Sequence, residues 1–365
     1  MKSKRSYKIV LIIHSLGIGG MERVMATLAN DFSSRDKTEV HLLLIGRKRN
    51  IKYELSNKVN VYKPSFKFNN KKRFWHTLLT ITFLRKTVNR LSPDVVLSFG
   101  EVWNSLVLIS LLYTNIPTYV SDRCQPDKSL GQIQDALRKW LYPNAYGVIA
   151  QTEQAKQVFL QQKLNDNIPV IGNPIQQRKP KRFEDRKKIV LSVGRLITSK
   201  HHAELIRLFA AIDLPEWQLV IVGGDALRQN NSRKLQQLIS ELGVEDKVTL
   251  TGTVKEVKDW YQRSSLFAFP SSSEGFPNVL GEALANGLPV VAFDCVAGPR
   301  DMVTDGVNGY LVETMDFGGF KNKLQHLMED ETLRAKMAEQ APASVERFDV
   351  QVIGERFYQT LTSHQ

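Results

Sequence analysis

The sequence predicts an α/β protein with two doubly wound, parallel β-sheets in separate domains. Short β-branched, apolar runs alternate with longer helical patterns along all 365 residues, an order typical of βαβ units. The most apolar runs contain almost no polar residue, as expected of strands that are buried on both faces of a sheet. The chain length and a hydrophobic content of 42% suit two domains with sizeable cores.

The apolar runs form two sets separated by a polar gap. The first set contains the expected strands 8–13, 39–45, 95–98, 118–121 and 147–150. The second set contains 189–193, 218–222, 248–251, 266–269, 289–292 and 309–312. Residues 176–188 are polar, contain a proline and follow neither hydrophobic period, which indicates an interdomain linker.

These boundaries predict two Rossmann-like domains facing each other across a central cleft. The first covers residues 1–174 and the second covers residues 189–343, with a linker over 175–188. The segment 344–362 has a helical pattern. We expect this last helix to pack back on the first domain.

The net charge of +13 is concentrated at one end of the chain. Residues 1–90 hold 20 Lys or Arg and 5 Asp or Glu, a balance of +15, so the other residues, with 30 basic and 32 acidic side chains, have a balance of −2. A basic terminal quarter indicates an anionic partner, either nucleic acid or lipid. The sequence carries no recognised nucleic-acid motif. We therefore expect an anionic membrane surface and no nucleic acid.

Three further features bear on the compartment. Cys124 and Cys295 are the only cysteines, which excludes a disulfide scaffold. The apolar stretch 95–113 is interrupted by polar residues too early to span a bilayer. The apolar run 9–13 leads through His14 into a glycine turn, without the cleavage site of a signal peptide. We expect a cytoplasmic protein that is peripheral on the inner face of the cell membrane.

In the second domain, a polar loop follows the expected strand 266–269. Pro277 suits the first position of the next helix, and the amides of residues 275–278 then point beyond the carboxyl end of the strand. Glu274 precedes this helix and Glu282 lies about a turn and a half into it. Each carboxylate can accept two hydroxyl donors of a sugar or ribose. Alternatively, Glu274 is an ordinary residue of a surface loop and Glu282 an ordinary residue of a helix.

Two cations follow the first strand of the same domain. Arg195 and Lys200 fall in the strand-to-helix loop, with Ser199 as the expected N-cap. Such a pair can neutralise a diphosphate without a metal ion, and no Asp-x-Asp run is present to hold one. Ordinary surface charges remain the alternative for each residue alone.

A glycine turn follows the opening strand of the first domain. Gly19 and Gly20 permit close approach of a ligand to the backbone. Glu22 occupies the third glycine position of a dinucleotide-binding fingerprint, and residues 46–49 after the second strand are basic rather than acidic. The glycine turn and these basic residues also fit an NADP-dependent oxidoreductase, but this alternative gives Glu274 and Glu282 no role.

Taken together, these segments resemble glycosyltransferase family 4, the retaining, nucleotide-sugar-dependent enzymes of the GT-B fold. Residues 274–282 match the family's E-x7-E element, and Gly194-Arg195 with Lys200, Gly19-Gly20 and residues 171–174 match in the expected order. Residues 98–99, 120–123, 141–143, 293–294 and 298–299 further resemble members that extend lipid-linked bacterial surface oligosaccharides. His201 departs from the family, which usually has glycine there.

The resemblance implies the activity. A hexosyl or N-acetylhexosaminyl group would move, with retention and without metal, from a nucleotide sugar, expected to be a UDP-sugar, to a lipid-linked glycan acceptor. The product would belong to surface polysaccharide, O-antigen or glycoprotein glycan synthesis. No cofactor is expected beyond the nucleotide-sugar substrate. Another GT-B enzyme, such as a UDP-sugar epimerase, is an alternative.

The resemblance also implies the site residues. Arg195 and Lys200 would bind the diphosphate and stabilise the leaving group, and Glu274 would hold the donor sugar; these three form the catalytic set. Glu282 would take the ribose, and the base would lie near Val254. The other implied donor-binding residues are Gly19, Gly20, Gly275, Phe276, Pro277 and Asn278.

A helix expected over residues 74–91 lies in the basic quarter. Phe74, Leu78, Ile81, Leu84 and Val88 form a stripe at helical spacing that should pack on the sheet, and a second stripe lies on nearly the opposite side. Aromatic residues interleaved with cations suit a membrane interface or an anionic lipid diphosphate; a helix buried on two sides is the alternative. The candidate acceptor or membrane residues are Lys67, Lys71, Lys72, Arg73, Trp75 and Phe83.

Overall fold

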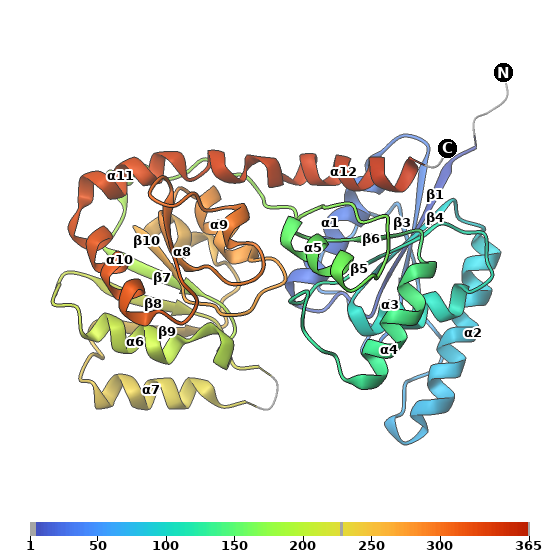
Figure 1. Ribbon diagram of the computed structural model, residues 1–365, viewed down its shortest axis with the longest axis horizontal. Helices are drawn as coiled ribbons and strands as arrows, with labels where there is room; N and C mark the ends of the chain where they lie inside the picture. Colours follow the sequence, from blue (N-terminus) through green and yellow to red (C-terminus); the bar gives the residue numbers. More distant parts are fainter. Residues whose placement is uncertain (1–4, 227–228, 364–365) are drawn as a thin grey trace. The chain divides into compact units, whose positions relative to one another are not determined.

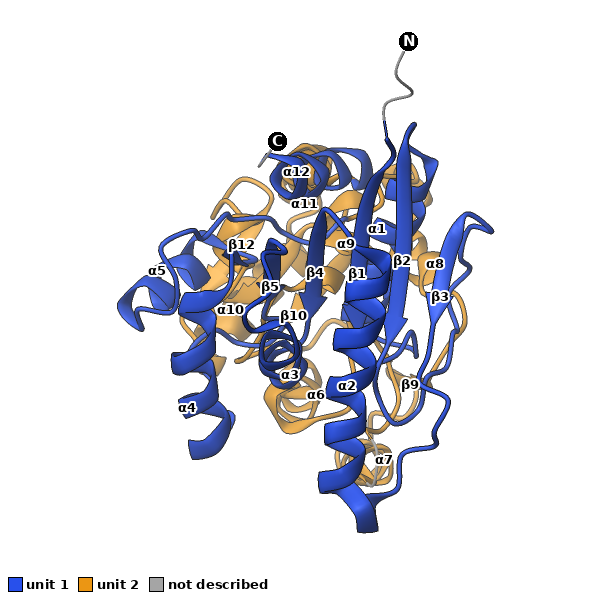
Figure 2. Ribbon diagram, turned by 90° about the vertical axis from the view of Figure 1, so that its right-hand side faces the viewer, with its two compact units in different colours: residues 1–174, 350–365 blue, residues 175–349 orange. Residues whose placement is uncertain are grey.

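The computed structural model describes residues 5–226 and 229–363. Two compact units make up the chain: unit 1 comprises residues 1–174 and 350–365, and unit 2 comprises residues 175–349 (Figures 1 and 2). Each unit contains one six-stranded sheet in which all neighbouring strands are parallel. Lys2 and Lys4 of the basic N-terminus lie outside the described residues.

The sheet of unit 1 has the order β3-β2-β1-β4-β5-β6. Its strands are β1 (Tyr7–Ile13), β2 (Thr38–Leu44), β3 (Val59–Tyr62), β4 (Val95–Phe99), β5 (Thr118–Ser121) and β6 (Gly147–Ile149). Five of them match the sequence prediction to within one residue at each end. The edge strand β3 was not predicted, because it is short and only Val59 of its four residues is buried.

Helices cover both faces of this sheet (Figure 1). They are α1 (Gly20–Ser34), α2 (Arg73–Leu91), α3 (Glu101–Leu111), α4 (Gln132–Leu141), α5 (Glu153–Gln161) and, from the far end of the chain, α12 (Val350–Thr362). The alternate strand residues Val10, Ile12 and Val96 share a core with Leu84 of α2 and Val107 of α3. Helices α1 and α12 pack against each other.

The sheet of unit 2 has the order β12-β11-β10-β7-β8-β9. Its strands are β7 (Ile189–Val193), β8 (Gln218–Val222), β9 (Val248–Gly252), β10 (Leu266–Phe269), β11 (Val290–Phe293) and β12 (Gly309–Val312), all within one residue of prediction. Its helices are α6 (His202–Ala210), α7 (Asn231–Glu241), α8 (Lys258–Arg263), α9 (Asn278–Ala285), α10 (Phe317–Glu329) and α11 (Glu331–Gln340). Side chains of α6, α7 and α10 share a core with the sheet around the fully buried Trp217, while α8 contacts β7 and α9 contacts β10 and β11.

The two boundaries of unit 2 lie next to each other. The amide of Ile175 donates to the carbonyl of Phe348 (2.7 Å), and Ile175 forms a parallel bridge with Asp349. Asp349 is extended and separates the 3₁₀-helix Ala343–Phe348 from α12, so the segment 344–362 is two helices rather than one.

The segment 175–188 belongs to unit 2. Its Arg186 guanidinium donates to the carbonyls of Tyr261 (3.1 Å), Ser264 (2.9 Å) and Asn286 (2.6 Å). Burial lowers the pKa of Arg186 to about 10. These three bonds attach the segment to the loops beside α8 and α9.

Candidate active site

The order of the strands in unit 2 places two loops side by side. Strands β7 and β10 are neighbours, yet the chain continues from β7 toward β8 and from β10 toward β11, in opposite directions across the sheet. Loops diverge at such a switch point and leave a crevice beyond the carboxyl ends of the strands, where ligands of doubly wound sheets bind. Arg195 and Lys200 follow β7, and Glu274 follows β10.

Lys200 and Glu274 meet at this switch point. The Lys200 ammonium is hydrogen-bonded to Oε1 of Glu274, and the two side chains are only 15% and 13% exposed. The ammonium also lies 5.2 Å from the centre of the Phe269 ring, at the end of β10. Two residues that are 74 positions apart, both selected from the sequence, therefore form one charged pair.

Arg195 lies on the same loop but is not part of this pair. Its side chain is exposed, and among residues 5–226 and 229–363 the structure shows no carboxylate paired with it. The loop is packed tightly on β8, because a Cβ on Gly223 would lie 1.8 Å from the carbonyl oxygen of Gly194. An exposed guanidinium on a fixed loop is available to a phosphate.

The loop 275–278 offers fewer amide donors than its sequence suggested. Pro277 is the N-cap rather than the first residue of α9, since its carbonyl accepts from the amides of Leu280 (3.0 Å) and Gly281 (3.2 Å). The Asn278 amide donates to the Phe276 carbonyl (2.9 Å), and proline has no N–H. The amides of Gly275 and Phe276 donate to no backbone carbonyl within the described chain.

Glu282, in α9, is oriented by a buried tyrosine. The Tyr261 hydroxyl donates to Oε2 of Glu282 (3.1 Å), and the Tyr261 ring, only 2% exposed, lies 6.0 Å from that of Phe267 in β10. A carboxylate that is fixed in this way keeps acceptor capacity for further donors.

An open cavity of about 580 Å³ lies at the carboxyl ends of β8 and β9, and sequence reasoning did not predict it. Its lining includes Gly223, Gly224, Asp225 and Gly252. Asp225 is already engaged, since its carboxylate accepts from the amides of Asn231 (2.7 Å) and Ser232 (2.9 Å) at the start of α7. Val254, the expected neighbour of the base, is partly buried two residues after Gly252.

No role in the site was predicted from the sequence for three residues near Lys200, namely His201, His202 and Cys295. The helix α6 begins at His202 and its N-cap is His201, so the predicted N-cap at Ser199 is wrong; Ser199 lies inside the 3₁₀-turn Thr198–Lys200. Burial lowers the pKa of His202 to about 4, which keeps this imidazole neutral. Burial, with the nearby Glu274 charge, raises the pKa of the Cys295 thiol to about 12.

In unit 1, the glycine turn is held by a tyrosine. The Tyr53 hydroxyl accepts from the Gly19 amide (3.1 Å) and donates to the Gly19 carbonyl (2.8 Å). Gly20 is the first residue of α1. The turn follows β1, which neighbours β4 at the switch point of this sheet, so the two predicted glycines occupy the ligand edge of unit 1.

Helix α2 differs from its sequence prediction. Leu84 and Val88 are buried as expected, but Phe74 and Leu78 are 70% and 39% exposed. Phe83, one of the candidate acceptor or membrane residues, is partly buried against the core. The reason is that the N-terminal end of α2 protrudes from unit 1 (Figures 1 and 2), so no sheet covers its first turns.

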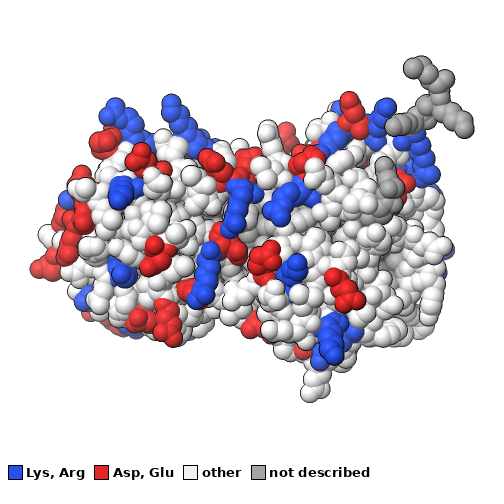
Figure 3. All heavy atoms as spheres, turned by 45° about the horizontal axis from the view of Figure 1, so that its top comes forward, with Lys and Arg blue, Asp and Glu red and all other residues white. Residues whose placement is uncertain are grey.

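The protruding end of α2 is apolar and basic. Trp75 is 65% exposed and Leu79 47%, and the cations Lys67, Lys71, Lys72 and Arg73 are exposed as well. In contrast, Lys and Arg are interspersed with Asp and Glu on the face of the molecule that Figure 3 shows. We call Phe74, Trp75, Leu78, Leu79 and these four cations the α2 tip.

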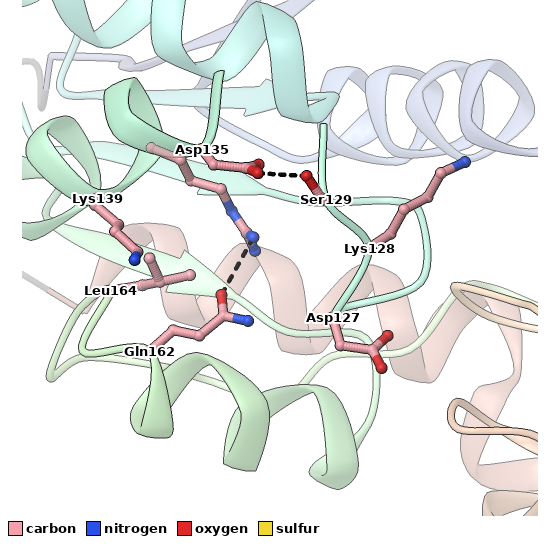
Figure 4. Close-up of a pocket in the computed structure, with 8 residues that line it drawn as sticks. Asp127, Lys128, Ser129, Asp135, Lys139, Gln162 and Leu164 are labelled. Atoms are coloured by element: carbon pink, nitrogen blue, oxygen red, sulfur yellow. Dashed lines mark hydrogen bonds between the residues drawn. The ribbon is translucent and has the colours of Figure 1, made fainter. Parts of the chain in front are cut away.

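A second cavity in unit 1, of about 210 Å³, lies between the loop before α4, α4 itself and the residues after α5 (Figure 4). Its main polar groups bond to one another: Asp135 accepts from the Ser129 hydroxyl (2.5 Å), and Arg138 donates to Gln162 (3.3 Å). The buried Arg138 also pairs with Asp122 (2.6 Å). Because these partners are satisfied internally, we assign no ligand to this cavity.

Comparison with known proteins gives the family. The family described as "Glycosyltransferase Family 4" matches residues 18–178, and that described as "Glycosyl transferases group 1" matches residues 174–344. A Campylobacter jejuni subsp. jejuni protein named N-acetylgalactosamine-N,N'-diacetylbacillosaminyl-diphospho-undecaprenol 4-alpha-N-acetylgalactosaminyltransferase is 31% identical over 94% of this chain and 96% of its own. The chain belongs to glycosyltransferase family 4.

Solved structures agree with a GT-B fold for this glycosyltransferase. The lipopolysaccharide outer core galactosyltransferase WaaB in its apo form has a TM-score of 0.81 at 23% identity, over 98% of this chain and 100% of that one. Anabaena HepE in complex with UDP has a TM-score of 0.80 at 21% identity, with the same coverage. A transferase assignment leaves no support for the oxidoreductase alternative.

Across residues 5–226 and 229–363, no helix combines the length and the apolar character that crossing a bilayer requires. In the same part of the chain, no group of three or more His, Cys, Asp or Glu side chains is arranged to hold a metal ion.

Proposed function

We propose that this glycosyltransferase moves a hexosyl or N-acetylhexosaminyl group from a UDP-sugar to a lipid-linked glycan acceptor. The Lys200–Glu274 pair at the switch point of unit 2 carries the proposal, because it sets a cation for a diphosphate beside a carboxylate for sugar hydroxyls. The names of two relatives support the acceptor: both Campylobacter jejuni transferases, 31% and 25% identical, are named for undecaprenol-linked glycans.

The proposed chemistry uses only groups of this chain. Negative charge develops on the departing phosphate, and cations already fixed beside it lower the barrier. Arg195 and Lys200 supply two charges there, so no metal ion is needed. Glu274 and the free amides of Gly275 and Phe276 would hold the sugar, Glu282 the ribose, and the cavity at β8 and β9 the base.

No carboxylate of the site is proposed as a covalent nucleophile. Glu274 is already engaged by Lys200, which suits a positioning role toward the sugar. Retention would then follow from attack on the same face that the phosphate leaves, with a phosphate oxygen taking the acceptor proton. Gly19 and Gly20 lie on the ligand edge of unit 1, and their part in donor binding stays a prediction from the sequence.

A panel of UDP- and GDP-sugars with undecaprenyl-diphosphate-linked acceptors tests the function. We expect transfer from a UDP-sugar, an unchanged anomeric configuration by NMR, and the same rate in EDTA as with manganese. Loss of activity in EDTA that manganese restores would disprove the metal-independent mechanism. Interconversion of the free UDP-sugar without transfer would instead identify an epimerase.

The α2 tip is proposed to bind the anionic membrane that carries the acceptor. Exposed aromatic and apolar side chains flanked by cations bind the interfacial region of bilayers, and each cation near the surface contributes about 1 kcal/mol. The first turn of α2 and the preceding 3₁₀-turn contain no acidic residue to oppose this.

We expect the double substitution Phe74→Ser and Trp75→Ser to reduce flotation with phosphatidylglycerol liposomes by about tenfold, since two large apolar side chains leave the interface. Trp140→Ser is the matched control, because Trp140 of α4 is similarly exposed (59%) but lies outside the α2 tip. Equal flotation of the double variant and the wild type would contradict the proposal.

A further inference from the structure

The residue after Lys200 has an unusual backbone conformation. His201 has φ 48° and ψ 37°, in the left-handed region that favours glycine. Its side chain is only 10% exposed. Glycine would adopt this conformation with less strain. The presence of a buried imidazole here therefore indicates a specific role for the His201 side chain.

The imidazole of His201 joins two loops. Its Nε2 is hydrogen-bonded to the hydroxyl of Ser272 (2.9 Å), in the loop that carries Glu274. The ring lies edge-on to Phe317 of α10 at 5.6 Å and to Phe293 of β11 at 6.4 Å. Its Nδ1 lies 3.8 Å from Oε2 of Glu204 in α6. Contacts at both ring nitrogens and at the ring itself therefore orient the imidazole toward Ser272.

A second connection lies on the other side of Lys200. The carbonyl of Ser199 accepts from the amide of Ser272 (2.9 Å) and from the hydroxyl of Ser271 (3.3 Å). The β7 loop is therefore attached to the β10 loop at residue 199 and again at residue 201. Lys200 lies between these two attachments, and Glu274 lies two residues after Ser272.

We propose that His201 is a positioning residue, which fixes the Lys200 ammonium against Glu274 and the donor diphosphate through its hydrogen bond to Ser272. This inference rests on the proposed role of Lys200. Displacement of a catalytic group by about 1 Å can cost as much as a hundredfold in rate. The backbone bonds of Ser199 limit the displacement when the imidazole is lost, so a smaller effect is expected.

The test compares His201→Gly with Ser272→Ala. Glycine adopts the left-handed conformation without strain, so His201→Gly removes the imidazole and relaxes the backbone. Each substitution should lower kcat about five- to tenfold, the value of one ordinary hydrogen bond, while the KM for the donor changes less than about threefold. The double variant should lose little more than Ser272→Ala alone, because both substitutions remove the His201–Ser272 bond, while Ser272→Ala also removes the 3.5 Å bond from its hydroxyl to the Ser199 carbonyl.

Rescue and controls separate positioning from a structural role. His201→Gln, which reaches Ser272 with an amide, should recover most of kcat. Thr198→Ala, an exposed change in the same 3₁₀-turn, should leave kcat unchanged. Wild-type kcat in folded Ser272→Ala, or additive losses in the double variant, would overturn this inference alone. A wild-type enzyme that neither binds UDP nor transfers sugar would instead overturn the proposed function.

Discussion

Lys200→Ala should lower kcat/KM for sugar transfer by about 10²–10³-fold, the usual cost of removing one fixed donor from a developing anion. The substitution removes the ammonium and leaves the largely buried Glu274 carboxylate without its cation. The affinity for UDP, measured by calorimetry, should also fall, because the same ammonium is proposed to contact the diphosphate.

The control for this prediction is Lys188→Ala in the same unit. Lys188 also pairs with a glutamate, Glu216 at 3.1 Å, but the two side chains are 48% and 44% exposed. An exposed pair of this kind contributes little, so activity should stay within twofold of wild type. Lys200→Ala with more than a tenth of wild-type activity would show that the departing phosphate is stabilised elsewhere.

Gly223→Ala should destabilise unit 2 and also weaken UDP binding. The added methyl group would lie 1.8 Å from the carbonyl oxygen of Gly194. This backbone cannot move aside cheaply, because the Gly194 amide donates to the carbonyl of Val222 at the end of β8 (2.9 Å). We expect a loss of about 2–3 kcal/mol of unfolding free energy, seen as a fall in the thermal midpoint of roughly 5–10 °C. The displaced loop carries Arg195, so UDP affinity should fall as well.

Gly306→Ala is the matched control for the backbone. Gly306 has φ 74°, and a methyl group there would meet no atom within 4 Å. The substitution Gly306→Ala should lower the unfolding free energy by only about 1–2 kcal/mol, through conformational strain, and leave UDP affinity unchanged. If both variants weaken UDP binding equally, the contact between Gly223 and Gly194 does not position the site.

Much of the fold could be predicted because the buried strands are almost entirely apolar. The runs at 189–193 and 118–121 match β7 and β5 without error. Strand β3 could not be found, because three of its four residues are partly or fully exposed and carry no strong pattern. The stripe on α2 was read correctly as helical, but periodicity does not reveal where the sheet beneath a helix stops.

The charged residues of the site were easier to predict than the residues that hold the loops of the site in place. Lys200 and Glu274 belong to short motifs in loops after strands, so each could be chosen from its neighbours in sequence. The bonds from Tyr53 to Gly19 and from His201 to Ser272 join residues 34 and 71 positions apart. No local pattern encodes such a contact, which depends on the strand order of each sheet.

The adjacent ends of unit 2 have a consequence for protein engineering. Because Ile175 and Asp349 are paired by a backbone bridge, residues 175–349 form a cassette whose entry and exit share one location. Exchange of this cassette with that of another family member requires two junctions, at 174/175 and 349/350, and leaves the sheet of unit 1 uninterrupted. Because the proposed donor site lies in unit 2, we expect such an exchange to alter donor choice while unit 1 stays intact.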